Sequence, residues 1–200
     1  MLRKHIQWRE LVQYDQISSW DLPDDLHGLL PQGFIGYDDN NFPILLALVG
    51  RWNAKKIVQG TSREDAVKPH WKSYDSMKKR MKGKFTKEGV PVTQMSAIVD
   101  LSELSLLQGT LQVFRALSDF ARGFEANFPE LLKTCVVINS PWFLPMFFKF
   151  IKPFLSPKTT DKIQFYGYNR DEWVEALRKI FPESSLPTIY GGTNDNYKIS

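Results

Sequence analysis

The chain has 200 residues, a length that suits one domain or one domain with a fragment of another. A hydrophobic content of 42% and a charged content of 24% are ordinary for a soluble globular protein, and neither a secretory signal nor a transmembrane run is present. The formal net charge of +4 favours an anionic membrane surface or nucleic acid as a partner without proving either. Because Cys135 is the single cysteine, an intramolecular disulfide is excluded, which fits a reducing, cytoplasmic location.

The N-terminal half is predicted to form a helix, a strand hairpin and a longer helical region. Apolar residues recur at helical spacing in residues 1–18, which predicts an amphipathic helix. Residues 34–49 predict a hairpin whose turn is Asp38–Asn41, because Asx side chains tolerate turn backbone. Within it, Ile44–Val49 is an unbroken apolar run, typical of a strand buried on both faces. Residues 53–84 are predicted to be mostly helical.

The C-terminal half alternates strands with helices. Buried strands are predicted at Met95–Val99, Thr134–Ile138 and Ile163–Tyr166. Amphipathic helices are predicted at Leu111–Phe128 and Asp171–Ile180. This alternation predicts an α/β fold with a mostly parallel sheet flanked by helices, and the N-terminal hairpin would make the sheet mixed.

One segment, Trp142–Leu155, is unusually apolar and aromatic. Six of its fourteen residues are aromatic, and its only charges are Lys149 and Lys152. A helix that is apolar nearly all round belongs in a core, in a membrane or over an apolar cavity, and this one is shorter than the ~20 residues that span a bilayer. A core helix, an interfacial element and a lid therefore remain. Pro145 and Pro153 bracket the run, which favours a bounded, displaceable unit.

Motifs for catalysis and for metal binding are missing from the sequence. It has no P-loop, no G-x-G-x-x-G run and no G-x-S-x-G elbow. The histidines, His5, His27 and His70, are scattered without a metal-ligand partner at i+4. Asp100, at a strand end, is either a catalytic acid or, more commonly, a cap for the following turn. We therefore expect no enzyme activity, no metal site and no cofactor other than a cargo.

Two motifs carry a resemblance to a known family. They are VVINSPWFLPMFFKFIKPFLSPKTTDKIQFYG at residues 136–167 and LPTIYGG at Leu186–Gly192. Together they resemble the CRAL-TRIO lipid-binding domain, and in particular the fungal-type phosphatidylinositol transfer proteins and supernatant protein factor, also called tocopherol-associated protein. The resemblance runs from about Leu2 to Gly192. It implies a terminal helix of a truncated N-terminal helical domain at residues 1–20 and the lipid-binding domain at 21–192. The polar composition after Gly192 predicts a flexible tail at 193–200.

The resemblance also implies that Trp142–Leu155 is a mobile gate helix over a hydrophobic lipid pocket. Because such a gate opens at a membrane and closes in water, its aromatic side chains would alternate between acyl chains and the pocket wall. A pocket for a two-chain lipid would hold roughly 1,000 Å³. The expected gate residues are Trp142, Phe143, Met146, Phe147, Phe148, Phe150, Ile151 and Phe154.

A headgroup site is implied in the same way. The phosphoinositide transfer proteins hold the inositol phosphate with the acid of a Y-P-E motif and with the T and K of P-x-T-x-x-K. Here the matching residues are Glu130, Thr159 and Lys162, which would supply an acceptor, a hydroxyl and a positive charge. An exposed lysine and a capping threonine are the commoner alternative for such a pair.

The match to this pattern is incomplete. Leu131 stands where the fungal-type proteins have a basic residue, and Met95 and Ala97 stand where they have phosphatidylcholine-binding hydroxyls. These departures weaken a phosphatidylcholine assignment and leave room for tocopherol, squalene or another isoprenoid.

We therefore expect a monomeric, cytoplasmic protein that binds one phosphatidylinositol-like phospholipid or isoprenoid and transfers or presents it between membranes. It would bind anionic membranes transiently and would not bind nucleic acid. The basic cluster Lys78–Lys87 is either a solvated helix end or a contact for acidic headgroups. The alternative function is a CRAL-TRIO protein-interaction or regulatory module without lipid transfer. A hollow interior and an intact Lys162–Glu130 pair would favour carriage, and a filled interior would favour the module.

Overall fold

The structure is a computed structural model that describes residues 2–199. Its strands form one sheet in the order β1-β2-β3-β4-β5, with only β1 and β2 antiparallel. The predicted α/β fold with a mixed, mostly parallel sheet is therefore confirmed. The strands are β1 Gln32–Tyr37, β2 Pro43–Ala47, β3 Met95–Asp100, β4 Leu132–Ile138 and β5 Ile163–Phe165.

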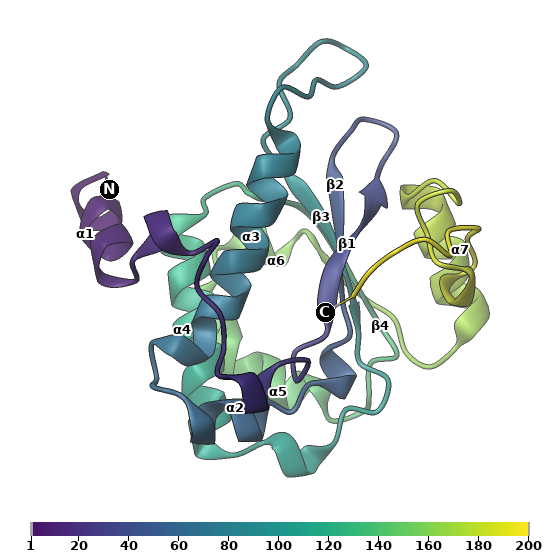
Figure 1. The fold of residues 1–200 in the computed structure, drawn as a ribbon. Helices are drawn as coiled ribbons and strands as arrows, with labels where there is room; N and C mark the ends of the chain where they lie inside the picture. Colours follow the sequence, from purple (N-terminus) through teal and green to yellow (C-terminus); the bar gives the residue numbers. More distant parts are fainter. Residues whose placement is uncertain (1, 200) are drawn as a thin grey trace.

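Helices cover both faces of this sheet, but unequally. In Figure 1, α7 lies alone on one side, whereas α2, α3, α4 and α5 lie on the other. Because successive side chains of a strand point to opposite faces, each central strand supplies both layers. The helices are α1 Leu2–Leu11, α2 Ala54–Gly60, α3 Lys68–Met81, α4 Leu111–Asn127, α5 Leu144–Ile151, α6 Pro157–Thr160 and α7 Arg170–Ile180.

The α7 face of the sheet is filled. Ile44, Ile98 and Val136 are fully buried there and pack with Trp173 and Leu177 of α7. All five residues of β2 are buried, which confirms the predicted strand buried on both faces. This side of the sheet is an ordinary close-packed core.

The predicted helical region 53–84 is divided in the structure. It forms α2, a 3-10 turn at Asp65–Val67 and α3. The break follows from local chemistry, because the Ser62 hydroxyl accepts the backbone N–H of Asp65 and starts a new turn. Pro69 lies in the first turn of α3, where a missing N–H costs nothing.

The two ends of the described chain lie against the domain body. In α1, which ends at Leu11 rather than at residue 18, the Trp8 ring lies 5.6 Å from that of Phe128 at the end of α4. The polar composition of residues 193–200 predicted a flexible tail. In the structure, the Asn194 side chain donates to the Ile35 carbonyl at 2.7 Å, and Ile199 packs on the α7-side core. Residues 193–199 are thus packed along β1 rather than loose. Ser200 lies outside the described residues.

The LPTIYGG segment fixes the carboxyl end of the sheet. The Tyr190 hydroxyl donates to Oδ2 of Asp100 at 2.6 Å, while Oδ1 accepts from the Asn139 amide and the Ser102 backbone N–H, each at 2.8 Å. Asp100 therefore caps the turn after β3, as the commoner interpretation of this residue predicts. Gly191 has a φ of +86°, a conformation that favours glycine.

We expect Tyr190→Phe to lower the free energy of unfolding by about 1.5–3 kcal/mol, the usual worth of a hydrogen bond to a charged group. Urea titration followed by tryptophan fluorescence measures this change. Tyr168→Phe, at an exposed hydroxyl without a hydrogen bond among the described residues, is the control. An unchanged midpoint for Tyr190→Phe would show that the hydroxyl does not support the sheet end.

Candidate functional site

A cavity of about 330 Å³ lies between the sheet and the helices opposite α7. The wall includes Leu45, Ala97 and Val137 of the sheet and Val113 and Phe120 of α4. Among residues 2–199, no Asp, Glu, Lys or Arg lines it. The interior on this side is therefore hollow and apolar, the arrangement that favours carriage over a protein-interaction module.

The aromatic segment closes this cavity, but its helix is shorter than expected. It begins at Leu144 and ends at Ile151, and a 3-10 turn, Lys152–Phe154, follows. Pro153 explains the end, because it cannot donate a helical hydrogen bond. The single helix predicted over Trp142–Leu155 is thus wrong in its length.

The predicted gate residues separate into two faces of this segment. Phe147, Phe148 and Ile151 line the cavity, and Phe143 is buried beside Phe147, with ring centroids 5.5 Å apart. The exposed face carries Trp142, Met146 and Phe150. Phe154 is half-buried under the Arg122 guanidinium, 4.1 Å from its ring centroid. The segment therefore presents apolar side chains to the cavity and to solvent at once.

The predicted headgroup residues are only partly brought together. Lys162 Nζ lies 3.1 Å from Glu130 Oε2 and also donates to the Leu132 carbonyl at 2.7 Å, so the expected ion pair is present. The hydrogen bond from Lys162 lowers the pKa of Glu130. Neither residue lines the cavity, whereas Thr159 does.

Thr159 has a partner that the sequence did not indicate. Its hydroxyl donates to Oε2 of Glu125, on α4, at 2.8 Å and lies 3.1 Å from the Ser156 hydroxyl. Burial raises the pKa of Glu125, but the hydrogen bonds from Ser156 and Thr159 outweigh burial and hold it below its usual range. A carboxylate 34 residues away in sequence could be found only from the fold.

His70 is the second residue that sequence reasoning missed. Its ring borders the cavity deep in the fold, 5.1 Å from the Trp52 ring and 4.8 Å from the Phe120 ring between centroids. Burial lowers its pKa from 6.5 to about 4, so the imidazole is uncharged at neutral pH. Tyr74 lies one helical turn further along α3 and also lines the cavity. This spacing was a usable signal, because residues i and i+4 share a helix face.

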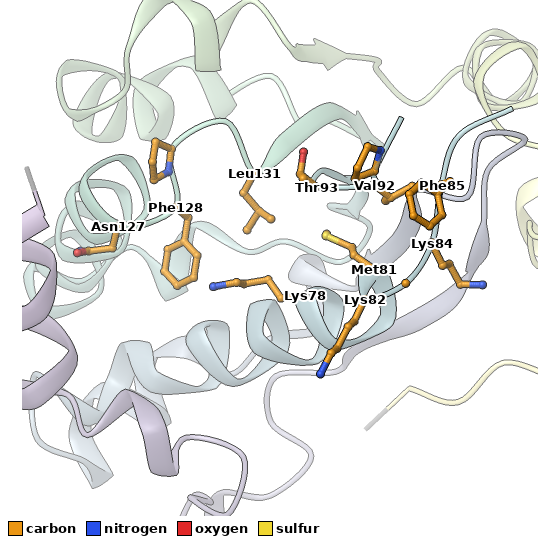
Figure 2. Close-up of a pocket in the computed structure, with 13 residues that line it drawn as sticks. Lys78, Met81, Lys82, Lys84, Phe85, Val92, Thr93, Asn127, Phe128 and Leu131 are labelled. Atoms are coloured by element: carbon orange, nitrogen blue, oxygen red, sulfur yellow. The ribbon is translucent and has the colours of Figure 1, made fainter. Parts of the chain in front are cut away.

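A second pocket, of about 420 Å³, is open to the surface at the end of α3. Figure 2 shows Lys78 extending toward Phe128 and the amino groups of Lys82 and Lys84 pointing away. Within residues 2–199, none of these three lysines forms an ion pair. Within the basic cluster, Lys79 pairs with Asp75 at 2.9 Å, whereas these three lysines leave a positive surface outside that ion pair. No helix in the described range is long and apolar enough to cross a bilayer.

Comparison with known proteins identifies the family. The model of the CRAL/TRIO domain matches residues 29–192. The chain belongs to the CRAL/TRIO domain family. The chain shares 27% identity over 199 residues with Patellin-3 of Arabidopsis thaliana, covering 96% of this chain and 38% of that protein. It shares 27% identity with the Arabidopsis phosphatidylinositol/phosphatidylcholine transfer protein SFH4, covering 94% of this chain and 31% of that protein.

Other matches support the same membership. The CRAL-TRIO domain-containing protein T23G5.2 of Caenorhabditis elegans is 26% identical, over 96% of this chain and 27% of that protein. The crystal structure of Sfh5 superposes with a TM-score of 0.71 at 16% identity, covering 98% of this chain and 65% of that one, and shows the same fold. The CRAL/TRIO domain described here thus spans well under half the length of these curated relatives.

The burial of His70 predicts a pH dependence of stability. Because its folded pKa of about 4 lies below the ordinary 6.5, the unfolded chain alone binds a proton between these values, and stability falls as pH falls through that window. In the wild type, we expect protonation of the unfolded chain at His70 to lower the free energy of unfolding by on the order of 2–3 kcal/mol between pH 7 and pH 4. His70→Phe should remove this contribution. Urea titrations across this range measure it, with the exposed His27→Gln as control. Equal slopes in wild type and His70→Phe would contradict the assignment.

Proposed function

We propose that this CRAL/TRIO domain encloses one hydrophobic lipid, a phosphatidylinositol-like phospholipid or an isoprenoid, and transfers or presents it between membranes without covalent chemistry. It would act in the cytoplasm as a monomer. The observation that carries this proposal is the apolar cavity, which no charged side chain of residues 2–199 lines and which an aromatic helix closes. The name of its relative SFH4, a phosphatidylinositol/phosphatidylcholine transfer protein, supports the same class of function.

Opening of the gate would explain how the cavity accepts its cargo. The volume of about 330 Å³ is at the lower end of the usual range for ligand pockets and well below the roughly 1,000 Å³ expected for two acyl chains. Phe147, Phe148 and Ile151 project into this space from α5, so outward movement of α5 would both open and enlarge it. Movement of such a lid takes microseconds to milliseconds.

The outer face of the gate has the character of a membrane-contacting surface. Trp142, Met146 and Phe150 are exposed on it. Leu107, in the 3-10 turn Leu106–Gln108, adds a further exposed side chain. That turn adjoins the gate, because a Cβ at Gly109 would lie 2.9 Å from the Phe147 ring. Exposed apolar surface of this kind marks a lipid or protein contact, and the unpaired lysines of the α3 end favour an anionic membrane.

The polar edge beside α6 is the proposed phosphate site. Lys162 would supply positive charge, Glu130 an acceptor for hydroxyls and Thr159 a hydroxyl at the cavity wall. Met95 and Ala97 line the cavity itself and offer no hydroxyl, so a phosphate-bearing headgroup would stay at this edge while its chains enter.

We expect Met146→Asp with Phe150→Asp to slow lipid transfer between vesicles at least ~10-fold, because charges that must enter hydrocarbon cost several kcal/mol. Both positions are exposed, so the fold should tolerate the change. Transfer of a fluorescent phospholipid between vesicles measures the rate, and Tyr168→Asp, exposed outside the gate, is the matched control. Wild-type transfer by the folded double variant would rule out the gate.

The headgroup site is tested by Lys162→Ala. We expect phosphatidylinositol loading to fall ~10-fold or more, because the phosphate loses its cation, while tocopherol loading persists. Displacement of a fluorescent lipid measures both ligands, and Lys179→Ala, at an exposed ammonium that pairs with Glu175 on α7, is the control. Equal losses for both ligands would mean that Lys162 supports the fold rather than the headgroup.

A further inference from the structure

Among residues 2–199, three polar side chains border the cavity without a hydrogen-bond partner, and one of them is the Tyr74 hydroxyl of α3. His70 of α3 and Gln32 of β1 both line it, and neither side chain forms a hydrogen bond to another residue within 2–199. Gln32 is only 9% exposed. An unpaired polar group in an apolar interior costs about 1–3 kcal/mol, so a ligand group that forms hydrogen bonds to these side chains would be favoured there.

Trp52 brings these two side chains to the same region of the cavity. Its ring lies 5.1 Å from the imidazole of His70 between centroids. Its indole N–H donates to the carbonyl of Pro31 at 3.2 Å, and Gln32 is the next residue in the chain. The indole N–H is therefore already satisfied, and His70 and Gln32 are left as free polar groups beside it.

The chemistry of this region limits what it can bind. A buried, uncharged imidazole offers one N–H and one lone pair, and a glutamine amide offers two N–H groups and a carbonyl. No cation lines the cavity within the described residues. A phosphate placed here would lose its hydration without compensation, a prohibitive cost. A hydroxyl, which both donates and accepts, matches the two side chains without any net charge.

We propose that His70 and Gln32 form a polar subsite that binds the hydroxyl group of an uncharged lipid alcohol enclosed in the cavity. This inference rests on the proposed function and adds a recognition point distinct from the edge formed by Glu130 and Lys162. The hydrocarbon tail lies along the apolar wall beneath α5. The closed volume of about 330 Å³ fits a single-chain or isoprenoid alcohol better than a two-chain lipid.

The test compares phytol with phytene, its counterpart without the hydroxyl, by displacement of a fluorescent lipid. We expect His70→Phe to weaken phytol binding about 10-fold, since a buried hydroxyl then loses its partner, and to leave phytene binding unchanged. His70→Gln, which restores a donor and an acceptor, should recover most of the phytol affinity. Met95→Leu, a volume-conserving change elsewhere in the wall, should alter both affinities by the same factor.

A measurement on the wild-type protein makes the test independent of any variant. With ¹⁵N-labelled histidine, phytol should shift the imidazole nitrogens of one histidine, and phytene should not. His5 and His27 lie outside the cavity wall and serve as internal references.

Equal effects of His70→Phe on the two probes, or no phytol-specific shift, would overturn the subsite. Uptake of phosphatidylinositol but of neither phytol nor phytene would also overturn it, while leaving carriage intact. Failure of the wild-type protein to take up any of the three lipids would instead refute the proposed function, and the inference with it.

Discussion

The packing of α3 against α4 through stacked aromatic rings is the constraint on which the hollow interior depends. The Trp71 ring stacks on Phe120 and Phe128, with centroids 5.8 and 5.3 Å away, and Tyr74 meets Phe124 at 5.6 Å. Gly123 allows this approach, because a Cβ there would lie 2.7 Å from the Trp71 ring. These rigid rings hold α3 and α4 together as one unit. Because the two helices already bury apolar surface against each other, they need not pack tightly onto the sheet.

The two faces of the sheet therefore have different energetics. The α7 face is close-packed, and the LPTIYGG segment fixes it to the sheet through Tyr190 and Asp100. The opposite face leaves Ala97, Val99 and their neighbours beside empty space, where side chains lose dispersion contacts. A lipid bound there would restore those contacts, and its binding to the folded state alone would raise the free energy of unfolding by mass action. The close-packed α7 face stabilises the fold, and this offsets the contacts that are missing around the cavity on the opposite face.

Sequence patterns predicted the sheet well because strand burial is local information. The apolar runs that begin at Ile44 and Met95 match β2 and β3 within two residues at each end. The Glu130–Lys162 pair followed from motifs, but the Thr159–Glu125 bond and the environment of His70 did not, since both depend on how α3, α4 and α6 pack. Whether apolar residues fill a core or surround a cavity is decided by helix spacing, which periodicity does not encode.

Charge is partitioned between the cavity and its edge, and this partition determines how each class of lipid can sit. Lys162, Glu130 and Glu125 remain at the edge, where water lowers the cost of their charges, while His70 and Gln32 reach the interior only because they are neutral. A charged phosphate would stay at the edge for the same physical reason, whereas an uncharged hydroxyl can enter the interior. A phospholipid would thus be held with its head outside the wall, whereas a lipid alcohol would be enclosed entirely, so gate closure would cover an alcohol more completely than a phospholipid.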